Sequence, residues 1–162
     1  MVGDRPADKV PRPYGAWYLE AMDSHGGWIA SAVDLVRFAS AVENTRHSKL
    51  LSERSVRAMF APPDGPPGHA DSGRPKPVYY GLGWSVRRVD DQGKINRWHA
   101  GRLDGSSTLL VIRHDGLCWA VLFNTSATPR GPAPAQEIDP LVHKAADQVK
   151  RWPRHDLFPK YR

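Results

Sequence analysis

Apolar residues recur at helical spacing in residues 31–44, SAVDLVRFASAVEN. The stripe consists of Ala32, Leu35, Val36, Ala39 and Val42. Residues three and four apart share one face of a helix, so this pattern predicts an amphipathic helix with one buried face. Ser31 stands at the N-cap position and Asp34 at the reciprocal position of a capping box.

A second, shorter helix is predicted over residues 50–60, LLSERSVRAMF, with Ser52 as its N-cap. Leu51 and Val56 occupy the two positions of a hydrophobic staple. The prolines at 62 and 63 should end this helix. Residues 61–77 then show no apolar period and form a long loop, a kind of segment that is often functional or disordered.

Residues 78–124 are rich in aromatic and β-branched side chains and contain repeated turn signals. Strands are predicted in the runs 78–89, 94–98, 107–114 and 117–124. Residues 90–93 (DDQG) turn the chain, and Asp115–Gly116 is a strong hairpin signal. The pattern predicts an antiparallel meander of about four strands.

Two further features refine this β region. Gly81 and Gly83 mark a bend or a close approach of backbone within the first strand run. The apolar runs 109–112 and 117–123 are continuous rather than alternating, which predicts strands covered on both faces.

A C-terminal helix is predicted with Asp139 as its cap and Pro140 in its first turn. Its apolar face comprises Ile138, Leu141, Val142, Ala145, Ala146, Val149 and Trp152. This face should dock on the sheet. The fold class is therefore α+β: helices, an antiparallel sheet of about four strands, and a C-terminal helix.

The length of 162 residues fits one domain. Residues 1–20 are proline-rich and charged and are expected to form an extended arm, followed by a domain over 21–153 and a basic tail over 154–162. The first residues carry no signal peptide, and no run approaches the roughly 20 apolar residues that span a bilayer. We expect no membrane span and, by default, a cytoplasmic chain.

The net charge of +6 changes the picture little, because the basic residues are scattered except in the segment 150–162. We interpret that segment as a solvated tail. A nucleic-acid or membrane patch is the alternative, and charge alone does not favour nucleic acid as a partner.

The sequence indicates no metal or cofactor. Its seven histidines form no H-E-x-x-H motif, and Cys118 is the only cysteine, so we expect it to pack in the core. The G-x-G at 81–83 lacks the Lys-Ser pair of a phosphate loop. Residues 24–28 (SHGGW) are similar to an esterase oxyanion loop, but the chain has no G-x-S-x-G.

A resemblance emerges from five segments taken in order. These are HGGWIASAVDLVRFASAV, LLSERSVRAMF, YYGLGW, HAGRLDGSSTLLVIRHDG and AVLFNTS. Together, over roughly residues 22–126, they resemble the C-terminal half of the serine β-lactamases and penicillin-binding-protein-like hydrolases. The resemblance is to the branch of class C β-lactamases, D-alanyl-D-alanine carboxypeptidases and related esterases. It implies a partial β-lactamase or transpeptidase-like fold.

The resemblance also implies a site. The family has a Lys/His-x-Gly motif on an edge strand, which here places His99 at the Lys/His position and Gly101 at the glycine. The backbone amide of Arg102 would then be one of two oxyanion donors. A side chain at 99 can polarise the site or hold a carboxylate, and glycine at 101 leaves the groove open. The alternative is a structural histidine that ends a strand.

Two other family motifs are absent. No serine of the chain opens S-x-x-K, and no tyrosine opens Tyr-x-Asn. In the family both precede the matching segments, so they would lie upstream of Met1. Acyl-enzyme chemistry needs a nucleophile beside its base, and Ser106 and Ser107, with no base in view, suit a turn.

Three functional hypotheses follow. The chain is the C-terminal part of a β-lactamase-related serine hydrolase, inactive alone, which acts on a small acyl substrate when a missing N-terminal half is supplied. Alternatively, it is a non-catalytic binding module that self-associates through an open sheet edge. A third reading makes the tail from Lys150 a nucleic-acid binder.

Overall fold

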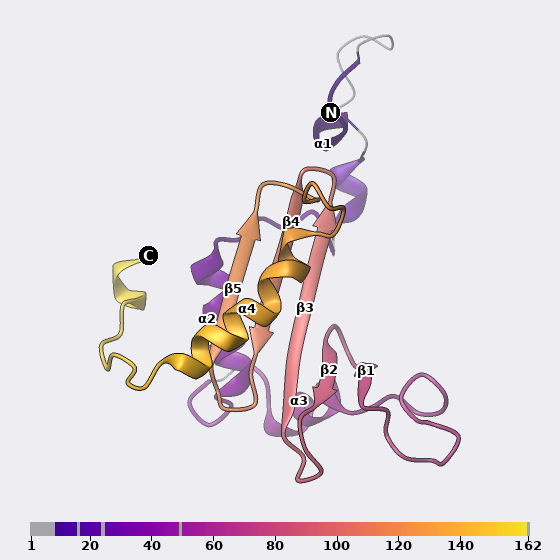
Figure 1. Ribbon diagram of the computed structural model, residues 1–162, viewed down its shortest axis with the longest axis vertical. Coiled ribbons are helices and arrows are strands. Elements are labelled where there is room, and N and C mark those ends of the chain that lie inside the picture. The colour runs from indigo at the N-terminus through magenta and orange to yellow at the C-terminus, as the bar shows by residue number, and fades with distance from the viewer. Residues whose placement is uncertain (1–8, 16, 24, 49, 162) are drawn as a thin grey trace. The chain divides into compact units, whose positions relative to one another are not determined.

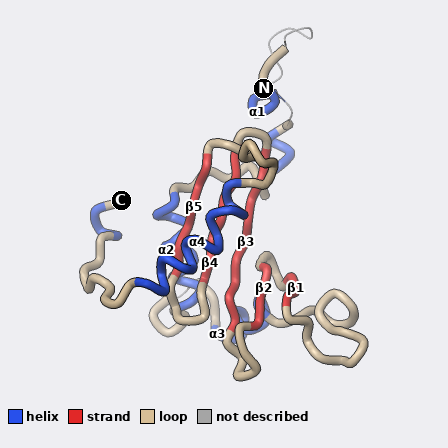
Figure 2. The backbone as a smooth tube through the Cα atoms, viewed as in Figure 1, coloured by secondary structure: helices blue, strands red, loops and turns tan. Residues whose placement is uncertain are grey.

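The computed structural model describes residues 9–15, 17–23, 25–48 and 50–161. The helices are α1 (Arg12–Gly15), α2 (Ala32–Glu43), α3 (Glu53–Phe60) and α4 (Pro134–Gln148), with short 3-10 turns at Leu19–Met22 and Phe158–Lys160. The strands are β1 (Val78–Tyr80), β2 (Ser85–Arg88), β3 (Ile95–Leu103), β4 (Ser106–Ile112) and β5 (Cys118–Phe123). They form one sheet in the order β1-β2-β3-β4-β5 (Figures 1 and 2). The predicted α+β class with an antiparallel sheet is confirmed.

The chain divides into two compact units. The α2 unit contains residues 32–99 and 110–120, and the α4 unit contains residues 1–31, 100–109 and 121–162. The α2 unit has a continuous apolar core, which consists of Ala39, Val42, Phe60, Tyr79, Trp84, Val86, Leu110 and Ile112. The proposed division at residues 20 and 153 stays a prediction.

Helices α2 and α3 of the α2 unit follow the predicted patterns. Ala39 and Val42 are fully buried, and Leu35 packs against the same core. Ser52 caps α3 as predicted, because its Oγ accepts a hydrogen bond from the Ser55 amide at 3.1 Å. Helix α3 ends at Phe60, two residues before the first proline.

The bend predicted at the two glycines divides residues 78–89 into two strands, which gives five strands instead of about four. Gly83 has a φ of +81°, and the Gly81 amide donates to the Trp84 carbonyl at 2.8 Å. A side chain at Gly81 would begin 2.5 Å from the carbonyl oxygen of Met59 at the end of α3. Gly81 therefore permits the close approach of this turn to α3.

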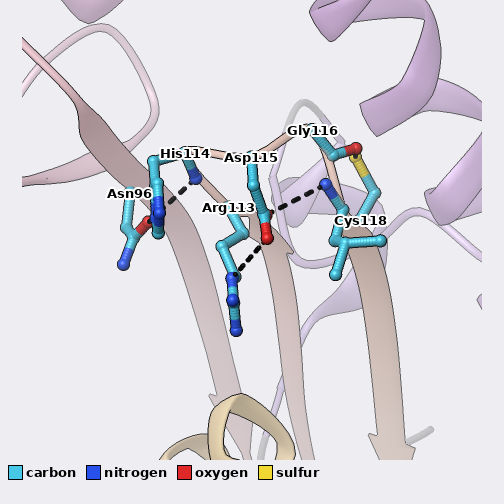
Figure 3. A network of polar contacts seen from close by, with 7 residues as sticks. Asn96, Arg113, His114, Asp115, Gly116 and Cys118 are labelled. Carbon is cyan, nitrogen blue, oxygen red and sulfur yellow. Dashed lines mark hydrogen bonds and ion pairs between the residues drawn. The ribbon is translucent and has the colours of Figure 1, made fainter. Parts of the chain in front are cut away.

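Polar side chains fix the other two predicted turns. Asp90 accepts hydrogen bonds at 3.0 Å from the amides of Gln92 and Lys94 in the β2–β3 turn, which lower the pKa of its carboxyl group. In the β4–β5 turn, Gly116 has a φ of +86° and follows Asp115, which pairs with Arg113 at 3.0 Å (Figure 3). The Asp-Gly hairpin is confirmed.

Strands β4 and β5 differ in how deeply their side chains are buried. Residues 109–112 of β4 are all buried, as the continuous apolar run predicts. In contrast, β5 is only partly buried and Leu122 is 41% exposed, so full covering of residues 117–123 is wrong. The reason is position, because β5 lies at an edge of the sheet and lacks a neighbouring strand on one side in the described part of the chain.

The loop 61–77 has no regular strand or helix but is folded on itself. The His69 amide donates to the Gly65 carbonyl at 2.9 Å, and the Lys76 amide donates to Gly68 at 2.8 Å. His69 Nδ1 lies 3.1 Å from the Pro63 carbonyl oxygen. Backbone hydrogen bonds, rather than an apolar core, thus hold this loop.

The start of α4 differs from the prediction. The helix begins at Pro134, with Ala133 as its N-cap, and Pro140 lies inside it. Pro134 at the first position with Glu137 in the first turn is a start signal as good as the predicted Asp139–Pro140, and it comes earlier in the chain. Asp139 lies within the helix, and its Oδ1 lies 3.6 Å from Nε2 of His143, one turn later.

The apolar face predicted for α4 is only partly covered. Ile138, Val142 and Ala146 are half-buried, whereas Leu141 and Ala145 are exposed. Val149 and Trp152 lie beyond the end of the helix at Gln148 and do not share its face. Docking of α4 on the sheet stays a prediction, limited to the narrower half-buried stripe.

The N-terminal segment contains helical turns where an extended arm was expected. In α1, the Tyr14 amide donates to the Pro11 carbonyl at 2.9 Å. Arg12 pairs with Asp104 at 3.0 Å, and Pro13 lies against Gly105, so α1 contacts the β3–β4 turn. Proline suits the first turn of a helix, which explains why a proline-rich run can form one here. Residues 1–8 of the arm lie outside the described residues.

Candidate functional site

His99 lies in β3 at the point where the strand loses its neighbour. Strand β2 pairs with β3 only from Ile95 to Trp98, and the last pair is Ser85 with Trp98. No further β2–β3 pair follows, so the edge of β3 that faces β2 has no paired strand at His99 among the described residues. An open strand edge can form backbone hydrogen bonds with an extended ligand.

The His99 side chain is exposed and has one polar partner in the α2 unit. His99 Nε2 lies 3.1 Å from Tyr80 Oη, and the two rings meet edge to face with centroids 6.2 Å apart. Either group can donate, depending on the tautomer of the histidine. A neutral imidazole and a phenol carry one donor proton each, and their mutual hydrogen bond uses one of the two. The pair thus presents one remaining N–H or O–H that can donate to an anionic oxygen.

Tyr80 was not predicted as a site residue. The sequence excludes it from a Tyr-x-Asn motif, because Leu82 follows two residues later. Its place comes from the register, in which Tyr80 pairs with Ser85 and Ser85 with Trp98, next to His99. Aromatic residues at the end of β1 were visible in the sequence, but their register was not.

Gly101 has a close neighbour across the β3–β4 hairpin, within the α4 unit. Its amide donates to Thr108 Oγ1 at 3.1 Å, and a Cβ at position 101 would begin 2.5 Å from that oxygen. The absence of a side chain at Gly101 therefore makes room for Thr108. This is a second reason for a glycine at this position, besides the predicted need to leave the groove open. Thr108 is a second residue that the sequence did not single out.

Arg102 is exposed and follows Gly101 in β3. After Leu103, the last residue of β3, Asp104 and Gly105 form the turn that α1 contacts. This contact holds the end of β3 in the α4 unit, beside the amide proposed as an oxyanion donor. The roles of His99, Gly101 and the Arg102 amide stay predictions.

The other candidate groups are engaged or enclosed. The amides of His25 and Gly27 both donate to the Met22 carbonyl, at 2.9 and 3.3 Å, so this loop does not offer them to an oxyanion; Ser24 lies outside the described residues. Ser106 begins β4, and Ser107 is fully buried with no hydrogen-bond partner for its Oγ. A buried hydroxyl cannot meet a substrate.

Cys118 is no nucleophile either. Burial, and secondarily the nearby Glu43 carboxylate, raise the pKa of its thiol to about 11. The thiolate is the reactive form, so this residue is inert near neutral pH. The described residues contain no cluster of three His, Cys, Asp or Glu that could hold a metal ion.

The sheet and the His-x-Gly segment together indicate a class of fold. An antiparallel sheet with flanking helices carries a His-x-Gly segment on a strand whose outer edge is open. This arrangement is compatible with part of a β-lactamase-like acyl-transfer fold. A comparison with family models matches the β-lactamase family over residues 1–143. The chain belongs to the β-lactamase family, which supports a hydrolase-type function.

The match is longer than the resemblance over residues 22–126, because it includes the N-terminal arm and continues to His143 in α4. Residues 144–162 lie beyond it. No curated protein and no solved structure matches the chain. Within the described residues, none of the helices is long and apolar enough to cross a membrane.

Proposed function

We propose that this chain is the C-terminal part of a β-lactamase-related serine hydrolase of the class C β-lactamase, carboxypeptidase and esterase branch. It supplies one wall of an acyl-transfer site for β-lactam, D-alanyl peptide or ester substrates. The observation that carries the proposal is the exposed His99, hydrogen-bonded to Tyr80, at the place where the outer edge of β3 becomes free.

Each residue of this wall has a distinct role. The His99–Tyr80 pair holds an anionic oxygen of the substrate through the one N–H or O–H that their mutual hydrogen bond leaves available. The substrate backbone pairs with the free edge of β3, which Gly101 leaves unobstructed. The Arg102 amide donates to the oxyanion that forms when a nucleophile attacks the acyl carbon.

The nucleophile and its base come from another segment. The sequence of 162 residues contains neither S-x-x-K nor Tyr-x-Asn, and a hydroxyl without a base is a poor nucleophile. The partner is therefore an N-terminal half that carries both motifs. Without that half, the chain does not turn over acyl substrates.

The test has two arms. Purified chain alone should hydrolyse neither a chromogenic cephalosporin nor p-nitrophenyl acetate above the buffer rate. Turnover by the chain alone that disappears in His99→Ala would contradict the proposed inactivity. An in-frame S-x-x-K followed by Tyr-x-Asn in the upstream DNA would identify the missing half.

Coexpression with that half should restore turnover, and His99→Ala should lower kcat/KM by about 100-fold. His114→Ala is the matched control, because His114 lies in the β4–β5 turn and is engaged in a hydrogen bond with the Asn96 side chain of β3 (Figure 3). Equal loss in both variants would argue against a site at His99.

The alternative is a non-catalytic binding module on the same half-fold. The absence of a nucleophile motif favours it, because an exposed histidine–tyrosine pair can bind an anion without catalysis. The two proposals separate in the coexpression arm. A ligand that binds through His99 and Tyr80, without turnover in the reconstituted complex, would support the binding module.

A further inference from the structure

The last part of the chain combines unpaired cations with exposed apolar side chains. Residues 141–161 contain five lysines or arginines, namely Lys144, Lys150, Arg151, Arg154 and Lys160, against two aspartates. The ion pairs within the described residues involve none of these five cations. Their charge is thus available to a partner.

The apolar members of this segment face solvent. They are Leu141, Val149, Trp152, Leu157 and Tyr161, with exposed fractions between 40% and 59%. On α4, Leu141 and Ala145 are one turn apart and exposed, with Lys144 beside them, while Val142 and Ala146 are half-buried. The exposed apolar side of α4 therefore does not contribute to internal packing.

The combination of cations and exposed apolar side chains favours one kind of partner. A negative surface complements the five cations, and an apolar layer beneath it accommodates the leucines and the valine. Tryptophan and tyrosine, as at Trp152 and Tyr161, are the residues enriched at membrane–water interfaces. Nucleic acid would match the charge, but aliphatic side chains gain little from a phosphate backbone.

We propose that residues 141–161 form a docking surface for an anionic phospholipid bilayer, in which Trp152 and Leu157 enter the interface and the basic residues contact lipid phosphates. Most of this surface, residues 144–161, lies beyond the β-lactamase family match. The proposal does not depend on the hydrolase function.

Cosedimentation of the full chain with vesicles tests this. We expect binding to vesicles of phosphatidylglycerol and phosphatidylcholine in a one-to-two ratio and much weaker binding to phosphatidylcholine alone. Added salt should weaken the binding, because the attraction is partly electrostatic. Equal binding to both vesicles, or no binding to the anionic ones, overturns the proposal.

Two variants separate the charge from the apolar contribution. The triple variant Lys150→Glu, Arg151→Glu, Arg154→Glu should bind at least about 100-fold more weakly, since each cation contributes about fivefold. The control Arg46→Glu, Arg54→Glu, Arg74→Glu changes the net charge equally at exposed positions outside the segment and should keep most of the binding. Equal losses in the two triple variants mean a general charge effect and overturn the proposal.

The variant Trp152→Ser, Leu157→Ser keeps all charges and should weaken vesicle binding about tenfold or more. Unchanged thermal unfolding of each variant shows that the fold is intact. A DNA duplex serves as the competing ligand. Tighter binding to the duplex than to anionic vesicles, unaffected by this last variant, identifies a nucleic-acid surface and overturns the bilayer proposal.

Discussion

Arg97 is the most deeply enclosed charge of the α2 unit. Its Nη1 lies 2.7 Å from Glu43 Oε2, its side chain is 10% exposed, and its guanidinium stacks over the Phe60 ring at 5.0 Å. The pair joins α2 to β3 across the core. A buried charge that loses its partner is costly, because neither water nor another group replaces the lost interaction.

Glu43→Ala should therefore lower the free energy of unfolding by about 3 kcal/mol, at the low end for a buried pair because Glu43 is partly exposed. Urea denaturation followed by circular dichroism measures this. Glu53→Ala is the control, since the Glu53–Arg57 pair is exposed on both sides and should contribute less than about 1 kcal/mol. Equal effects of the two substitutions would contradict this account.

Cys118 gives a prediction on pH dependence. Its pKa is raised from 9.0 to about 11, mainly by burial, so the folded protein binds this proton more tightly than the unfolded chain does. The resulting stabilisation is complete below pH 9 and is lost as the pH rises through about 11. Iodoacetamide should modify the native thiol slowly at pH 8 and quickly after unfolding in urea. Rapid modification of native protein at pH 8 would contradict this.

At the level of single residues, the sequence indicated candidate site residues, but it did not indicate which side chains contact them. His99 and Gly101 could be selected because a short motif stands in the right order among others. Tyr80 and Thr108 could not, because their contacts with these residues depend on which strand positions pair. Register follows from packing and turn geometry, which a single sequence does not specify.

At the level of elements, turn residues were the most informative signals. Asp-Gly at 115–116 and the DDQG run predicted two hairpins, because glycine at positive φ permits the tight reversal. The predicted start of α4 was wrong because the sequence contains two proline start signals, Pro134 and Pro140, and local helix preference does not choose between them. The exposure of β5 was missed because an apolar run does not reveal whether a strand lies at an edge.

The β1–β2 turn supplies a prediction at this scale. Gly83→Ala should lower the free energy of unfolding by about 1 kcal/mol, because its φ of +81° disfavours a side chain although the space is open. Gly83→Asn should cost less, because asparagine tolerates this conformation. Gly81→Ala should cost about 2 kcal/mol, because its Cβ would meet the Met59 carbonyl oxygen. Thermal unfolding compares the three, and a larger loss at Gly83 than at Gly81 would contradict this order.

For the whole molecule, the sequence predicted the fold class and the family, because several weak segments in a fixed order are more specific than any one of them. The sequence of 162 residues contains neither S-x-x-K nor Tyr-x-Asn, on which the proposal of an N-terminal half rests. It could not show where the sheet would end. The structure places β1 and β5 at the two edges, and an unprotected edge strand pairs readily with another chain.

We therefore expect the chain to self-associate through β5 when the proposed N-terminal half is not supplied. Leu122 of β5 is 41% exposed, and Leu122→Lys places a charge on this edge, which should oppose pairing. Light scattering over a concentration series should show association of the wild-type chain and a shift towards monomer in this variant. Val89→Lys is the control, because Val89 is 44% exposed but lies outside the strands, and it should associate like wild type. A wild-type chain that stays monomeric and well folded at every concentration would argue against an open edge at β5.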